Sequence, residues 1–131
     1  MWLFKRWWHT LAVLGLILYA VLTPDPPQPE GLRLFEGADK VVHACMMATL
    51  CAVAVYDRRR AGLRCSPADI AAVALWVMAF GVLTELMQST LTDVRTGDPF
   101  DVLADWAGTA AAATAALVWL RTPSGARDTS R

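Results

Sequence analysis

Four long apolar runs dominate the sequence and restrict the folds open to it. They lie at residues 7–23, 41–56, 68–91 and 101–120. A helix needs about 20 residues to cross the hydrocarbon core of a bilayer, with a range of about 17–25. A helix on the surface of a soluble protein carries a charged face, whereas these runs are apolar on every side except for a few polar residues near one end. The sequence therefore predicts membrane-spanning helices.

The composition agrees with this prediction. Hydrophobic residues make up 56% of the 131-residue chain and charged residues only 18%, whereas soluble proteins contain about 45–50% apolar residues even with glycine included. We predict an all-α integral membrane protein, a bundle of four transmembrane helices at about residues 7–23, 39–56, 67–91 and 99–120. The helices form a single domain, residues 1–131, and residues 121–131 are expected to be a disordered cytoplasmic tail.

Lysine and arginine are distributed unequally between the two sides of the predicted bundle. One side holds nine of them: Lys5, Arg6, Arg58, Arg59, Arg60, Arg64, Arg121, Arg127 and Arg131. The other side holds three: Arg33, Lys40 and Arg95. Because loops rich in these residues stay in the cytoplasm, we predict cytoplasmic N and C termini in a multi-pass protein of the plasma membrane, in contact with membrane lipid. The formal net charge of zero gives no reason to expect a nucleic-acid partner.

The polar side chains of the last three runs collect in one layer, near the outer ends of the helices. Pairs three or four residues apart share a helix face, and three such pairs occur: Asp39 with His43, Glu85 with Gln88, and Asp101 with Asp105. Lys40 and Arg95 can reach the same layer. Because charged groups inside a membrane are costly, we expect these groups to face one another or a water-filled cavity.

Some of these residues also have a purely structural interpretation. The stretches SPAD, residues 66–69, and DPFD, residues 98–101, each have a capping residue, then proline, then an acid two residues later. Asp98 is therefore predicted to be a helix cap, and Asp101 can equally serve only to complement the start of its helix. For Glu85 and Asp105, an interhelical network that only fixes packing explains their presence as well as catalysis does.

Small residues recur every four positions in the last run, at Ala104, Gly108, Ala112 and Ala116. Such a stripe lets another helix approach closely. We expect it to pack against a neighbouring helix, with a homo-oligomer through the stripe as one outcome.

Three short motifs resemble the VanZ-like family, small membrane proteins named for an accessory protein of teicoplanin resistance. The motifs are DKVVH, TELMQ and RTGDPFDVLADWAGT, and the matching residues are Asp39, Lys40, His43, Glu85, Gln88, Arg95, Asp101 and Gly108. The chain has Asp105 where the family often has asparagine. The resemblance implies a helical membrane fold in the cell envelope and, for some members, a link to tolerance of glycopeptide antibiotics, but it names no reaction.

We therefore expect a polar pocket, open to the outer face, that binds or modifies a lipid-linked or cell-wall ligand and affects antibiotic resistance. His43 and Glu85 are the candidate catalytic base and acid, since histidine titrates near neutral pH. The candidate ligand-binding residues are Asp39, Lys40, Gln88, Arg95, Asp101 and Asp105, with Lys40 and Arg95 holding an anionic group. A divalent metal on His43, Glu85 and Asp101 stays open, but the spacing carries no metal signature, so no metal or cofactor is predicted.

Two other classes of function remain open at this point. One is a small transporter in which Glu85 is the coupling acid. The other is a non-catalytic membrane scaffold that docks a partner through the small-residue stripe.

Overall fold

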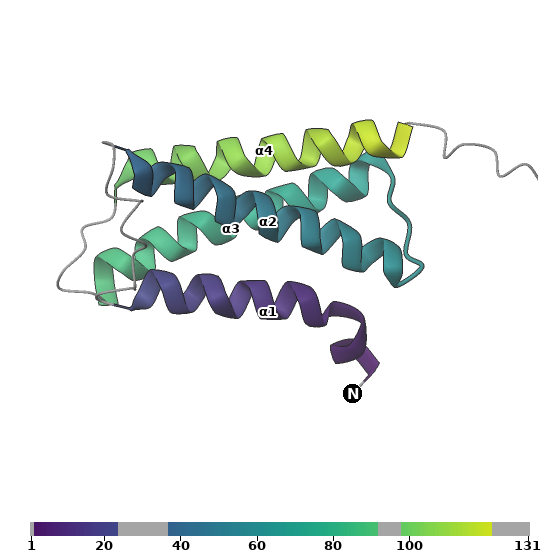
Figure 1. Ribbon diagram of the computed structural model, residues 1–131, viewed down its shortest axis with the longest axis horizontal. Helices are drawn as coiled ribbons and strands as arrows, with labels where there is room; N and C mark the ends of the chain where they lie inside the picture. The colour runs from purple at the N-terminus through teal and green to yellow at the C-terminus, as the bar shows by residue number, and fades with distance from the viewer. Residues whose placement is uncertain (1, 24–36, 92–97, 122–131) are drawn as a thin grey trace, which may run out of the picture.

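The computed structural model describes residues 2–23, 37–91 and 98–121, with side chains from Arg6 onward. These residues form four helices and no strand: α1 (Trp2–Leu22), α2 (Ala38–Arg60), α3 (Pro67–Leu91) and α4 (Pro99–Arg121). The helices lie side by side, α2 packs most extensively on α4, and the first turns of α1 and the last turns of α4 lie at the same end (Figure 1). We call this end the Asp57 end and the opposite one, where α2 and α4 begin, the His43 end.

The starts of α3 and α4 follow the predicted pattern of capping residue and proline. Ser66 and Asp69 cap α3 reciprocally: the Ser66 N–H donates to Asp69 Oδ2 at 2.9 Å, and the Asp69 N–H donates to Ser66 Oγ at 3.3 Å. In α4, Asp98 Oδ1 accepts from the Phe100 N–H at 2.9 Å. The predicted capping role of Asp98 is therefore confirmed.

The first two helices are longer than predicted. α2 continues beyond residue 56 to Arg60 because Asp57 and Arg58, although charged, both find partners on other helices. It ends where Gly62 takes a φ of 71°, a left-handed conformation that commonly closes helices. α1 begins at Trp2 and has one non-helical residue, Trp7.

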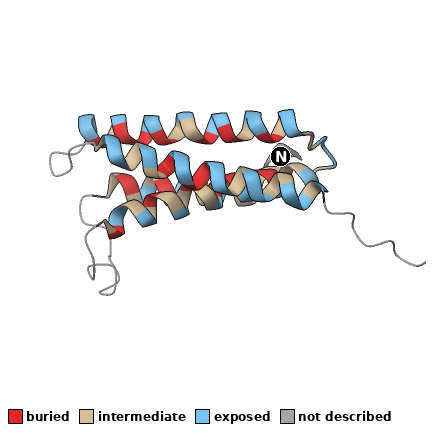
Figure 2. Ribbon diagram, turned by 90° about the horizontal axis from the view of Figure 1, so that it is seen from above, coloured by how far each residue is buried: buried red, intermediate tan, exposed pale blue. Residues whose placement is uncertain are grey.

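The bundle has polar groups inside and large apolar groups outside. The buried polar side chains are Thr10, His43, Asp57, Thr84, Glu85, Gln88, Asp105 and Thr109, and the exposed apolar ones include Leu16, Tyr19, Leu75, Leu91 and Phe100. Figure 2 shows the buried residues on the sides of the helices that face one another. Exposed apolar surface on this scale requires a partner, which in a bilayer is lipid.

Three of the helices, α2, α3 and α4, are long and apolar enough to cross a membrane. The part of α1 from Arg6 to Leu22 is also apolar but shorter. Together with the exposed apolar surface, the three candidate spans indicate an all-helical membrane protein whose outward side chains contact lipid.

One member of the small-residue stripe of α4, Gly108, packs within the chain. Gly108 is buried against α2, so that a Cβ atom added there would overlap the backbone carbonyl of Ala44. This contact explains why α2 packs so closely on α4. A homo-oligomer through the same stripe stays a prediction.

Candidate functional site

Three helices bring one histidine and three acids together at the His43 end. His43 of α2 places Nδ1 at 3.3 Å from Asp105 Oδ1 of α4 and at 3.9 Å from Glu85 Oε1 of α3. Its Nε2 lies 4.0 Å from Asp101 Oδ2, one turn earlier in α4. We call these four residues the acid–histidine cluster. The shared layer of polar groups expected from the sequence is present for these members.

Most of the acid–histidine cluster is shielded from solvent, although two of its carboxylate oxygens lack a hydrogen bond. His43 and Glu85 are each 7% exposed and Asp105 is fully buried. Within the described part of the chain, Glu85 Oε1 and Asp105 Oδ2 have no hydrogen-bond partner. Leaving a buried acceptor unsatisfied costs about 1–3 kcal/mol, and more when the group is charged. Such groups need an explanation beyond packing, such as a bound ion or ligand.

The second oxygen of Glu85 is held by the start of α4. Glu85 Oε2 accepts a hydrogen bond from the backbone N–H of Asp98 at 3.1 Å. Asp98 is also the cap of α4 and an ion-pair partner of Lys40, so one residue connects three helices. Only the capping role of Asp98 could be predicted from the sequence, because a hydrogen bond from a backbone N–H to a distant carboxylate leaves no pattern in the sequence.

Lys40 forms ion pairs with three carboxylates. Its Nζ lies 2.9 Å from Asp98 Oδ2, 3.0 Å from Asp101 Oδ1 and 3.5 Å from Asp39 Oδ2. The hydrogen bond from Lys40, followed by the one from the Phe100 N–H, holds the pKa of Asp98 below its ordinary value. Lys40 thus ties the starts of α2 and α4 together, and its predicted role in holding an anionic group stays a prediction.

Gln88 and Asp39 are not members of the cluster. Gln88 is buried and its Nε2 donates to the backbone carbonyl of Val21 at 3.3 Å, which ties α3 to α1. Asp39 lies at the rim with a side chain 61% exposed. Arg95 lies outside the described residues.

The described residues at this end carry an excess of acid. Five carboxyl groups face only two basic side chains, Lys40 and His43; the acids are Asp39, Glu85, Asp98, Asp101 and Asp105. In addition, His43, Glu85 and Asp101 each offer one ligand atom, and these atoms lie within 4.8 Å of one another. The arrangement therefore suits a cation better than an anion.

A second buried acid, Asp57, lies at the opposite end and was missed from the sequence. It is fully buried and accepts hydrogen bonds from the Thr10 N–H at 2.9 Å and from Thr10 Oγ1 at 2.8 Å. His9 Nδ1 lies 2.6 Å from its other oxygen. Asp57 directly precedes three arginines, and the sequence therefore suggests that it belongs to a charged loop. The feature that could have indicated its role is the presence of two polar residues, His9 and Thr10, at a matching depth in the first apolar run.

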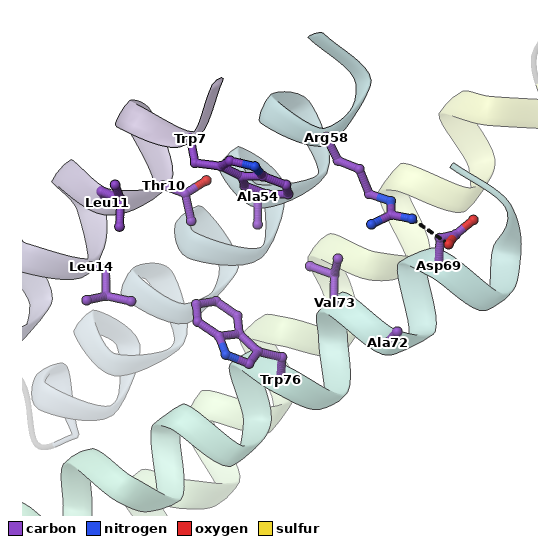
Figure 3. A pocket seen from close by; sticks show the side chains of 10 residues that line it. All are labelled: Trp7, Thr10, Leu11, Leu14, Ala54, Arg58, Asp69, Ala72, Val73 and Trp76. Atoms are coloured by element: carbon purple, nitrogen blue, oxygen red, sulfur yellow. Dashed lines mark hydrogen bonds and ion pairs between the residues drawn. The ribbon is translucent and has the colours of Figure 1, made fainter. Parts of the chain in front are cut away.

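A pocket of about 390 Å³ lies near Asp57, between α1, α2 and α3. Its walls are mainly apolar, and the rings of Trp7 and Trp76 border it (Figure 3). The charged groups on its wall, Arg58 and Asp69, are paired at 2.6 Å. A pocket of this kind accepts an apolar group but offers no chemistry comparable with that of the acid–histidine cluster.

Comparisons with protein-family models, with curated proteins and with solved structures gave no match to this chain.

Proposed function

We propose that this chain is a multi-pass protein of the plasma membrane, similar to the VanZ-like family, in which α1 also crosses the bilayer and both termini are cytoplasmic. Contacts of α1 at both ends of the bundle support the fourth span: Thr10 reaches Asp57, and Val21 accepts from Gln88. The unequal distribution of lysine and arginine supports the orientation. In this orientation the His43 end faces the outside of the cell.

The proposed function is to bind, and act on, a lipid-linked or cell-wall ligand at the acid–histidine cluster. One observation carries the proposal: Glu85 is buried beside His43 with one carboxylate oxygen unpartnered among the described residues. A side chain that only fixed helix packing would have its hydrogen-bonding capacity satisfied. In the proposed reaction His43 acts as general base and Glu85 as general acid.

The experiment is to express the protein in a glycopeptide-susceptible bacterium and to measure teicoplanin tolerance. The wild-type chain should raise tolerance, whereas Glu85→Gln and His43→Ala should abolish the increase with unchanged abundance in the membrane. Ser89→Ala is the control, since Ser89 is exposed at the same end and its hydroxyl donates to the Leu86 carbonyl of its own helix. Wild-type tolerance in both site variants contradicts the proposal.

The same carboxylate oxygen, which lacks a hydrogen bond among the described residues, favours a second candidate, a small transporter with Glu85 as its coupling acid. Proteoliposomes distinguish the two functions. Solute uptake driven by a pH gradient, and lost in Glu85→Gln, supports the transporter; tolerance without such uptake supports the envelope function.

A further inference from the structure

We propose that the acid–histidine cluster is a divalent metal site, with His43, Glu85 and Asp101 as ligands and Asp105 as the residue that orients His43. The inference rests on the proposed function in taking this cluster as the working site. It adds the class of cofactor and assigns His43 and Glu85 to metal binding in place of acid–base catalysis. Spacing in the sequence gives no sign of it, because the three ligands come from three different helices.

The distances place the three side chains close to a coordinating arrangement. One ligand atom from each residue lies within 4.8 Å of the others, and His43 Nε2 is 4.0 Å from Asp101 Oδ2. Ligand atoms around a metal with bonds of about 2.0–2.2 Å lie about 3–3.5 Å apart. Closing the site requires rotation of these side chains, since Glu85 Oε1 lies nearest to His43 Nδ1, at 3.9 Å.

Asp105 has the position of a residue that orients a metal-binding histidine. Its Oδ1 lies 3.3 Å from His43 Nδ1, so Nδ1–H donates to the carboxylate and Nε2 keeps the lone pair. Histidines that bind metals usually donate the other ring N–H to a carboxylate in this way, which fixes the tautomer and the ring orientation. Nε2 is also the nitrogen nearest to Asp101 Oδ2.

Among the described residues, the charges of the cluster favour a bound cation. Lys40 already pairs with Asp98 and Asp101, and it makes no ion pair with Glu85 or Asp105 among the described contacts. Glu85, more than nine-tenths buried, has Oε1 without a hydrogen-bond donor in the described part of the chain. A divalent ion would satisfy this oxygen and offset the mutual repulsion of the acids.

The donor set indicates the kind of metal. One imidazole nitrogen and two carboxylate oxygens suit first-row divalent ions such as Mn²⁺ and Zn²⁺, whereas sites built from oxygens alone suit Mg²⁺ and Ca²⁺. A metal here would also reconcile an acidic site with an anionic ligand, because the ion can bind a phosphoryl or carbonyl oxygen as a Lewis acid.

The test is metal binding by the purified full chain in detergent or nanodiscs. The protein is treated with chelator, incubated with Mn²⁺ or Zn²⁺ alone, and analysed for bound metal by mass spectrometry and for affinity by calorimetry. Wild type should bind one of these ions stoichiometrically. Glu85→Gln should weaken binding by more than about 10-fold, the lower limit expected even for loss of an outer-shell partner. The control Ser89→Ala, an exposed residue at the same end whose hydroxyl donates to the Leu86 carbonyl of its own helix, should bind as wild type does.

Glu85→Gln is suitable because its amide oxygen can still accept from the Asp98 N–H, which preserves the contact between α3 and α4. His43→Gln tests a second ligand in the same assay, with the same loss expected. Binding of neither ion by wild type, or wild-type affinity in both Glu85→Gln and His43→Gln, overturns the metal site.

This outcome is separable from the tolerance assay. Loss of tolerance in Glu85→Gln, in a protein that binds neither ion, would refute the metal site and leave the proposed function standing. The opposite result is that wild type binds metal stoichiometrically and that Glu85→Gln loses the metal but keeps wild-type tolerance. It would support the metal site and refute the proposed function.

Discussion

Glu85 accepts a hydrogen bond from the backbone N–H of Asp98 at 3.1 Å, while its other carboxylate oxygen is buried without a donor among the described residues. Asp57, the buried acid at the opposite end, has a contact on each of its oxygens. The two acids therefore differ in how fully the fold satisfies the hydrogen-bonding capacity of their carboxylates. Asp57 is built into a complete hydrogen-bond network that docks α1 on α2, whereas Glu85 leaves part of its bonding capacity open for a ligand.

Replacing Asp57 with asparagine should destabilise the protein. An amide offers one acceptor oxygen in place of two, so the contact with a carboxylate oxygen is lost either on the Thr10 side or on the His9 side. Breaking a buried charged network by changing one partner costs about 3–5 kcal/mol when the remaining charge is uncompensated. Because His9 is partly exposed, its charge is not left in that position. We therefore expect the free energy of unfolding to fall by about 2–3 kcal/mol, nearer the cost of an unsatisfied buried group. Thermal unfolding in detergent, followed by circular dichroism, measures the change.

Thr49→Ala is the control for this experiment. The Thr49 hydroxyl is exposed and donates only to the Cys45 carbonyl of its own helix. An unfolding temperature for Asp57→Asn equal to that of Thr49→Ala would mean that the Asp57 network does not hold α1 in place.

Gly108→Ala should also destabilise the bundle, because the new Cβ would overlap the Ala44 backbone and force α2 and α4 apart. Overpacking of this kind costs about 1–3 kcal/mol, and more where backbone must move. Gly15→Ala is the matched control, since a Cβ there meets nothing within 4 Å. Equal stability of the two variants contradicts the close approach of α2 and α4.

This expectation changes how the scaffold hypothesis has to be tested. Under the scaffold hypothesis, Gly108→Leu should break function and Glu85→Gln should not. Since Gly108 packs inside the chain, such a variant also disturbs the fold, and loss of function no longer identifies a docking surface. Outward-facing residues of α4, such as Leu103 and Val118, are better probes of a partner.

Asp105→Asn should preserve most of the metal affinity, whereas Asp105→Ala should reduce it about 10–100-fold, as loss of an outer-shell partner does. The amide oxygen of asparagine can accept from His43 Nδ1–H in place of the carboxylate. The difference between the two variants separates an orienting role from a requirement for charge. Equal loss of affinity in both variants would show that the charge itself is required.

The arrangement of the site could be predicted in part. The pairs Asp39–His43 and Asp101–Asp105 share a helix face by spacing alone, and helix direction places Glu85 at the same depth. Which members converge could not be predicted, since this depends on how the helices rotate about their axes. That rotation is fixed by contacts such as Gly108 against Ala44, and it brings Asp105 to His43 while Gln88 faces α1.

The end of the second helix was predicted wrongly for a related reason. The second helix was expected to end at residue 56 because charges follow, but it continues to Arg60. Asp57 is satisfied by α1, Arg58 pairs with Asp69, and Arg59 lies 3.9 Å from the ring centre of Trp119. Tertiary partners of this kind are not visible in one helix taken alone.

The central claim is that the acid–histidine cluster is a ligand site and not a packing network, and the unfolding of Glu85→Gln tests it most directly. In chelator-treated protein in detergent, the variant should be more stable than wild type, by about 1–3 kcal/mol, because it removes an unsatisfied buried charge and keeps the bond from Asp98. Functional sites commonly carry such a stability cost. A fall in the unfolding temperature comparable with that of Asp57→Asn would contradict the account and make the cluster structural.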